Sequence, residues 1–228
     1  MIDFIKDYFP NINKEGYFFI AVFAIITLIF FSFSNALGWV GVVLTLWCIF
    51  FFRDPERFTP TQENIIVSPA DGVVQRIVKD VELPKEISDT SEKMTRVSVF
   101  LDVFNVHVNR IPVSGVVKKL HYFHGKFFNA SLDKASEHNE RQFVLIETEN
   151  GSQIGLVQIA GLIARRIICD LKEGEKVSTG NRYGIIRFGS RVDLYLPQSM
   201  NIKVIEGQTM IGAETVIADF EKAASVNK

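Results

Sequence analysis

The chain has 228 residues, 47% of them hydrophobic, and it carries 25 Lys and Arg residues against 26 Asp and Glu. This length can hold one domain of common size together with a membrane segment. The near-zero net charge argues against a nucleic acid as the main partner, because phosphate binding needs a net basic face. Two widely separated cysteines predict neither a disulfide framework nor a cysteine metal site.

A run of 37 residues without charge, 16–52, lies near the N-terminus. A single membrane-spanning helix needs about 20 residues, and the polar and glycine-containing stretch "SFSNALGW" interrupts the run. We therefore predict two helices, about 17–33 and 37–52, that form a hairpin. Both helices are close to the lower length limit for crossing, so a hairpin that spans twice and one that dips into a single leaflet remain open.

Basic residues flank the apolar run on both sides. Lys6 and Lys14 precede it, and Arg53 and Arg57 follow it. By the positive-inside rule, both ends of the hairpin would lie on the cytoplasmic side of the membrane.

The stretch "FRDPERFTP" after the apolar run contains two prolines, which interrupt both helix and strand. It is typical of a linker, and its arginines would lie at the level of the lipid headgroups. We therefore expect a membrane-associated helical hairpin at 1–52, a linker at 53–62 and a further domain at 63–228.

Short apolar or alternating runs follow the linker and are separated by turn residues, as in "TRVSVFL" and "RVDLYLP". This pattern predicts β-strands. Glu149-Asn150-Gly151 between "FVLIET" and "QIGLVQI" predicts a hairpin turn. We expect a mainly β domain, with one short helix near 131–140.

A weak internal repeat connects "SPADGVV" at 68–74 with "IPVSGVV" at 111–117. Together with "KEGEKVSTG", it is similar to the paired hairpins of lipoyl and biotinyl carrier domains, which form a flattened barrel. The carrier lysine of those domains is missing from any comparable turn. The repeat therefore predicts a barrel-sandwich fold and no particular function.

Three residues would suit a catalytic site: Asp71 in "SPADGVV", His107 in "FNVHVNRIP" and Ser190 in "RFGSR". A serine hydroxyl is a poor nucleophile until a base removes its proton, and a carboxylate can orient that base. Asp71 would equally suit a turn, and His107 a structural position in a strand. Ser190 after Gly189 would suit a β-bulge. The Gly-x-Ser-x-Gly elbow is missing, which argues against a plain serine hydrolase.

Four stretches together resemble phosphatidylserine decarboxylase proenzymes: "FGS" before an alternating strand, "ADG" upstream of it, "VHVNRIPVSG" between the two, and "ASEHNER". The similarity is to the short, archaeal-type branch of this pyruvoyl-dependent family, which has an N-terminal hydrophobic hairpin. It extends over nearly the whole chain, from the apolar hairpin to "DLYLP". Each stretch alone is weak, whereas the combination is highly specific.

The resemblance implies that the protein cuts its own chain between Gly189 and Ser190. Ser190 Oγ, deprotonated by His107 with Asp71 orienting this base, would attack the preceding carbonyl and convert the amide into an ester. Elimination would then release a β chain, 1–189, and an α chain, 190–228, that begins with a pyruvoyl group.

The activity implied by the resemblance is decarboxylation of phosphatidylserine to phosphatidylethanolamine. The pyruvoyl group derived from Ser190 is the expected covalent cofactor; it would form a Schiff base with the serine amine and accept the electron pair released with CO2. A membrane phospholipid as substrate explains the hairpin, so we expect the enzyme at the cell membrane with its catalytic domain on the cytoplasmic side. The β and α chains would form a heterodimer, with a higher oligomer left open.

One position departs from the longer bacterial branch of the family, which has a second histidine where this chain has Phe104. His124, His138 or His107 itself would have to take over its role in decarboxylation. Arg166 would contact the lipid phosphate or face the solvent. "SEHNER" has no accompanying second set of ligands, so no metal site is expected.

Two other functions remain open from the sequence. An ether-lipid analogue of archaetidylserine type shares the reacting serine headgroup, so the site residues do not distinguish it from phosphatidylserine. A membrane-anchored, lipoyl-like adaptor without enzymatic activity would keep its chain intact, and it would tolerate changes at the three candidate residues.

Overall fold

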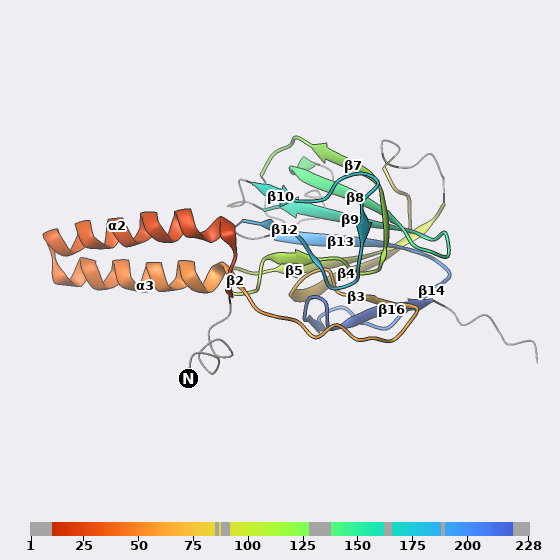
Figure 1. Ribbon diagram of the computed structural model, residues 1–228, viewed down its shortest axis with the longest axis horizontal. Helices are drawn as coiled ribbons and strands as arrows, with labels where there is room; N and C mark the ends of the chain where they lie inside the picture. Colours follow the sequence, from red (N-terminus) through yellow and green to blue (C-terminus); the bar gives the residue numbers. More distant parts are fainter. Residues whose placement is uncertain are drawn as a thin grey trace, which may run out of the picture.

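The computed structural model describes residues 11–84, 87, 92–127, 138–161, 166–187 and 190–220. Two antiparallel helices project from one end of a β domain (Figure 1). The expected combination of an N-terminal apolar helical hairpin with a mainly β domain is confirmed.

The hairpin consists of α2 (Tyr17–Phe33) and α3 (Asn35–Phe51), preceded by the short 3-10 helix η1 (Lys14–Gly16). These bounds confirm the two predicted helices to within two residues at each end. Ser34 separates the helices because its backbone is extended, and its Oγ caps α3 by accepting a hydrogen bond from Ala36 N at 3.2 Å.

A small polar contact joins the two helices inside the hairpin. The hydroxyl oxygens of Thr27 and Thr45 lie 3.0 Å apart, and each hydroxyl also bonds a main-chain carbonyl of its own helix. Gly41 permits this close packing, because a Cβ at that position would lie 3.0 Å from the Cα of Thr27.

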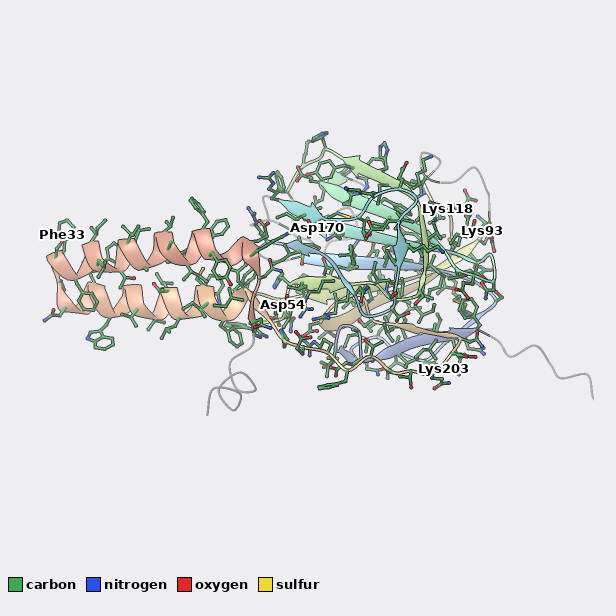
Figure 2. All side chains as sticks on the ribbon, viewed as in Figure 1. Phe33, Asp54, Lys93, Lys118, Asp170 and Lys203 are labelled. Carbon is green, nitrogen blue, oxygen red and sulfur yellow. The ribbon has the colours of Figure 1, made fainter. Side chains whose placement is uncertain are left out.

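The outer surface of the hairpin is apolar, as the side chains in Figure 2 show. Leu28, Phe33 and Trp39 are each at least 65% exposed. The helical segment Lys14–Phe33 is long and apolar enough to cross a membrane, whereas the 17 residues of α3 extend about 25 Å, less than a hydrocarbon core of about 30 Å. This surface supports membrane association of the chain.

The β domain contains one large sheet and two small ones. The strand order of the large sheet is β11-β7-β8-β9-β13-β5-β4-β15, and every neighbouring pair is antiparallel. In chain order its strands are β4 (Gly72–Val81), β5 (Met94–Leu101), β7 (Gly115–Phe123), β8 (Arg141–Glu147), β9 (Gln153–Ala160), β11 (Lys176–Val177), β13 (Ser190–Pro197) and β15 (Thr209–Met210).

The two small sheets have three strands each, in the orders β10-β12-β6 and β14-β16-β3. Their strands are β3 (Ile65–Val67), β6 (Val108–Arg110), β10 (Ile167–Cys169), β12 (Arg182–Ile186), β14 (Met200–Ile202) and β16 (Val216–Phe220). At the base of the hairpin, β1 (Asn11–Ile12) pairs with β2 (Arg53–Asp54).

The large sheet is buried on both faces near its centre. Its inner face and the small sheets enclose the main core, to which β13 contributes Val192, Leu194 and Leu196. A second cluster covers the opposite face and includes Phe143 and Tyr195. The central strand β13 therefore has buried residues along its whole length, although its sequence alternates in polarity.

The weak sequence repeat corresponds to a structural repeat. Gly72 begins β4 opposite β15, and Gly115 begins β7 opposite β11, so the two motifs occupy matching positions near the two edges of the large sheet. The motifs also exchange equivalent main-chain bonds: Val67 N donates to Pro112 O at 3.0 Å, and Arg110 N donates to Pro69 O at 2.8 Å. The β domain is thus built from two similar halves.

The predicted turn between β8 and β9 is confirmed. Gly151 has a φ of +83° and its N donates to Thr148 O at 2.9 Å, a conformation that favours glycine. The predicted helix near 131–140 lies largely outside the described residues, at 131–137.

Candidate active site

Ser190 is the first residue of β13, in the middle of the large sheet. It lies opposite Leu101 of β5 and Ala160 of β9. Its side chain is completely buried, and its Oγ has no hydrogen-bond partner among the described residues. A buried hydroxyl without a partner costs free energy, which marks this position as a candidate reactive site. Gly189, the other half of the predicted cleavage site, lies outside the described residues.

His107 immediately precedes β6 and is also completely buried. Its Nδ1 lies 3.0 Å from the main-chain oxygen of Asn105, which can only accept, so Nδ1 carries the proton and Nε2 the lone pair. Nε2 has no hydrogen-bond partner in the described part of the chain. Burial lowers the pKa of His107 to about 4, so the ring is a neutral base at neutral pH.

The fold brings the segments of His107 and Ser190 to the hairpin end of the β domain. Ile186, four residues before Ser190, donates its N–H to the main-chain oxygen of His107 at 3.4 Å. The imidazole packs against Phe51 at the end of α3, with ring centroids 4.3 Å apart. The hairpin therefore covers the candidate base and keeps it away from water.

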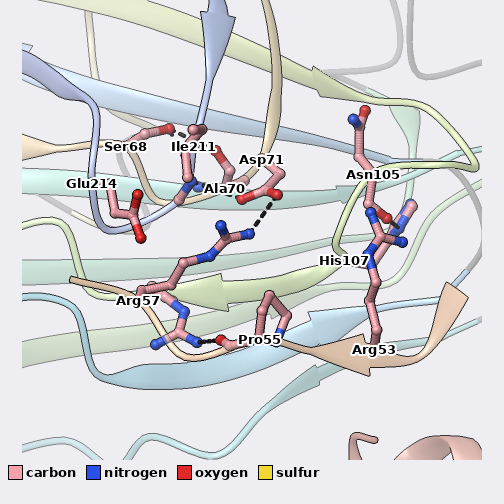
Figure 3. A network of polar contacts seen from close by, with 12 residues as sticks. Arg53, Pro55, Arg57, Ser68, Ala70, Asp71, Asn105, His107, Ile211 and Glu214 are labelled. Carbon is pink, nitrogen blue, oxygen red and sulfur yellow. Dashed lines mark hydrogen bonds and ion pairs between the residues drawn. The ribbon is translucent and has the colours of Figure 1, made fainter. Parts of the chain in front are cut away.

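Asp71 lies in the turn before β4 and has different partners. Its Oδ1 accepts a hydrogen bond from Gly212 N at 2.8 Å, and its Oδ2 forms an ion pair of 2.6 Å with Arg57 of the linker (Figure 3). Burial raises the pKa of Asp71, while these two partners act in the opposite direction. The structure does not join Asp71 to His107 by a hydrogen bond.

The carboxylate that acts electrostatically on His107 to favour its charged form is Asp102, at the start of the loop between β5 and β6. Its Oδ1 accepts a hydrogen bond from Phe104 N at 2.7 Å. Neither Asp102 nor the bond between Arg57 and Asp71 was predicted from the sequence. Asp102 stands five residues before His107, a spacing that belongs to no catalytic motif and offered no signal.

A second pair of buried polar side chains, Asn109 and Gln158, lies close to the segments of His107 and Ser190. Gln158 of β9 donates to Asn109 Oδ1 at 2.9 Å and to Ile168 O at 3.3 Å, and both amides are completely buried. Asn109 is the middle residue of β6, two residues after His107. This pair ties the small sheet that follows His107 to the large sheet that carries Ser190.

The three residues predicted to contact substrate are exposed. His138 lies beside Asn139, whose Nδ2 donates to Ala160 O at 2.7 Å, so it belongs to the segment next to the Ser190 strand pair. His124 packs against Tyr122 at 5.0 Å between ring centroids. Arg166 has no carboxylate within 4.0 Å among the described residues, and no metal-binding group of three His, Cys, Asp or Glu occurs among them.

The comparisons with known proteins agree on one family. Residues 44–218 match the family model described as phosphatidylserine decarboxylase. The chain is 58% identical over 215 residues to the phosphatidylserine decarboxylase proenzymes of Rickettsia akari and Rickettsia felis, and this alignment covers 94% of the chain and 93% of each relative. The proenzyme of Rickettsia typhi is 56% identical over the same length.

Proposed function

The chain belongs to the phosphatidylserine decarboxylase family, and from this premise we propose how it works. It converts phosphatidylserine into phosphatidylethanolamine and CO2, and its cofactor is a pyruvoyl group. Our proposal is that this group is made from Ser190 by a cut after Gly189. The observation that supports it most directly is the buried Ser190 Oγ without a partner among the described residues, in the same end of the domain as a neutral buried imidazole.

The proposed cut transfers an acyl group and then eliminates it. Ser190 Oγ attacks the Gly189 carbonyl carbon while His107 Nε2 takes the hydroxyl proton. The ring returns this proton to the nitrogen of Ser190 as the C–N bond breaks, which leaves an ester and a free amine. Loss of the Cα proton and cleavage of the Cβ–O bond release Gly189 as a carboxylate. Water then replaces the nitrogen of residue 190, which leaves as ammonia, and residue 190 becomes a pyruvoyl group. The products are the β chain, 1–189, and the α chain, 190–228.

Asp71 has the role of orienting His107 in this proposal. The Asp71 carboxylate accepts hydrogen bonds from Arg57 and Gly212 N, whereas His107 Nδ1 donates to Asn105 O. Asp71 can therefore orient the ring directly only when Nδ1–H exchanges Asn105 O for the carboxylate, and this exchange would be part of maturation.

In decarboxylation, the pyruvoyl group supplies a carbonyl that accepts electrons from the bond to the departing CO2. The chain provides a dry site for this step, because Phe51 and the main core enclose the position. Phe104, at the position where the longer bacterial branch has a second histidine, is 62% exposed in the loop before His107. His124, His138 and Arg166 remain the candidates for contacting the substrate, and no carboxylate of the described residues pairs with Arg166.

We propose that the hairpin, 1–52, holds the catalytic domain, 63–228, against the cytoplasmic face of the membrane through the linker, 53–62. The apolar hairpin surface and the position of His107 under Phe51 support this arrangement, because a lipid headgroup would enter from the membrane side. The N-terminal hairpin also supports assignment to the short, archaeal-type branch. The functional unit would be the heterodimer of the β and α chains.

Replacement of Ser190 by alanine tests the proposed cut. We expect Ser190→Ala to leave one intact chain without decarboxylase activity, because the variant has no nucleophile. The matched control is Ser152→Ala. It changes the serine immediately before β9, and the protein should still be cut into two chains. Electrophoresis of the purified proteins measures the cut, and a Ser190→Ala protein that still divides at this position would contradict the proposal.

A further inference from the structure

Arg53 is held in a fixed position between the hairpin and the catalytic domain. Its Nη1 donates to Phe50 O at 2.8 Å, at the end of α3, and its Nη2 donates to Phe104 O at 2.7 Å, in the loop before His107. The guanidinium carbon lies 3.8 Å from the centroid of the Phe50 ring. Two carbonyls and one aromatic ring thus orient the cation.

Arg53 differs from other cations near the hairpin base because it has no carboxylate partner among the described residues. The paired cations and their carboxylates are Lys14 with Asp170, Arg57 with Asp71, Arg110 and Arg182 with Asp54, and Arg187 with Glu15. Among the described residues, no carboxylate oxygen lies within 4.0 Å of Arg53. Two of its five N–H groups make these two bonds, so within the described part of the chain three remain for a ligand.

The Arg53 guanidinium lies beside the loop that leads to His107. Figure 3 shows the Arg53 side chain on the same side of the polar network as Asn105 and His107. Arg53 interacts electrostatically with Asp71 and Asp102, although neither carboxylate forms an ion pair with it. An anion that enters this end of the domain would meet a cation that is already oriented and partly desolvated.

We propose that Arg53 binds the phosphate of the phospholipid substrate. This inference rests on the proposed function and adds a residue that recognises the headgroup. In phosphatidylserine, one oxygen and one carbon separate the phosphorus from the serine Cα, so the phosphate must lie close to the reacting position. A guanidinium fork matches two phosphate oxygens, and its place directly after α3 is the level of the lipid headgroups.

Arg53 could affect the KM in three ways: by binding the phosphate, by binding the substrate carboxylate, or by a general attraction of cations to anionic lipid. Inhibition by the product distinguishes phosphate binding from carboxylate binding, because phosphatidylethanolamine keeps the phosphate and lacks the carboxylate. Lys14→Gln tests for the general attraction. It also removes one positive charge at this end of the molecule, but from a residue in an exposed ion pair with Asp170.

The experiment uses the full-length, self-cleaved protein in mixed detergent and lipid micelles. We expect Arg53→Gln to yield the same two chains as the wild type, to raise the KM for phosphatidylserine about tenfold to a hundredfold, and to weaken inhibition by phosphatidylethanolamine by a similar factor. Arg53→Lys should recover part of both losses. Lys14→Gln should change either value less than about twofold.

An unchanged inhibition constant for phosphatidylethanolamine in Arg53→Gln would overturn the phosphate assignment, and so would equal effects of Arg53→Gln and Lys14→Gln. Equilibrium binding of labelled phosphatidylethanolamine to the uncleaved Ser190→Ala protein, with and without Arg53→Gln, tests the same contact without turnover. It keeps a failure of this inference distinguishable from a failure of the proposed cut.

Discussion

The two halves of the β domain use the same main-chain contacts around different side chains. In one half, His107 O accepts a hydrogen bond from Ile186 N at 3.4 Å, and in the other half Asn64 O accepts one from Phe220 N at 2.9 Å. The two donors end β12 and β16, which occupy matching central positions in the small sheets. His107 therefore stands on a backbone position that the other half fills with an asparagine.

The same correspondence holds for the candidate carboxylate. Asp71 Oδ1 accepts from Gly212 N at 2.8 Å, and Ser114 Oγ accepts from Thr179 N at 3.0 Å, each next to the glycine that begins its strand. The side chain at this position fixes a neighbouring loop in both halves. Only the half with Asp71 adds a charge, which Arg57 of the linker balances.

The surroundings of the two positions differ more than their backbones. The hairpin covers His107, whereas Asn64 is exposed and lines an open pocket of about 610 Å³. Burial is what keeps His107 neutral, and it also removes the Ser190 side chain from the solvent-accessible surface. The two halves thus share their scaffold and differ in the apolar cover that the hairpin places over His107.

The largest expected difference between the halves concerns His107. Replacing it by the residue of the other half, His107→Asn, should slow self-cleavage about a hundredfold to ten-thousandfold, because the proposed general base is lost. Asn64→Ala should have no effect on cleavage. Pulse-labelled precursor followed over time gives both rates. Wild-type cleavage in His107→Asn would remove this residue from the mechanism.

A smaller effect is expected when the charge of Asp71 is removed. Asp71→Ser should keep the hydrogen bond from Gly212 N, as Ser114 does in the other half, but should slow self-cleavage about a hundredfold because the carboxylate is missing. Thermal unfolding checks that the fold is retained, and Ser114→Ala is the matched control. If Asp71→Ser were cut as fast as the wild type, the carboxylate would serve the loop alone.

The remaining expected effect is on stability in acid, not on cleavage, and it sharpens the contrast between a buried and an exposed position. The pKa of folded His107 is about 4, below its usual value of 6.5. Between these values the unfolded chain binds a proton that the folded chain does not, so stability falls as the pH is lowered through this range. The loss from this group is about 3 kcal/mol between pH 7 and pH 4.

Denaturant unfolding of the uncleaved Ser190→Ala protein at pH 7 and pH 4 measures this loss. The same comparison in Ser190→Ala combined with His107→Asn should lack the contribution of the histidine. Equal losses in the two proteins would show that His107 is already protonated or accessible in the folded chain.

Patterns within a segment could be predicted well from the sequence. The uncharged run and the break around Ser34 predicted both helices, and the two Gly-Val-Val motifs predicted the repeat. The contact of Arg57 with Asp71 and the charge of Asp102 next to His107 could not be predicted. They depend on how the linker and a loop dock onto the sheets, which leaves no periodic signal in the chain. The distinction between Arg53 and its paired neighbours has the same origin.

The most direct test of the central claim is the intact mass of the purified protein. We predict two chains: residues 1–189 with a free carboxylate at Gly189, and a 39-residue chain that begins with a pyruvoyl group in place of Ser190. Reaction of the smaller chain with a carbonyl reagent would identify the ketone. A single chain with the full mass that nevertheless decarboxylates phosphatidylserine would contradict the account.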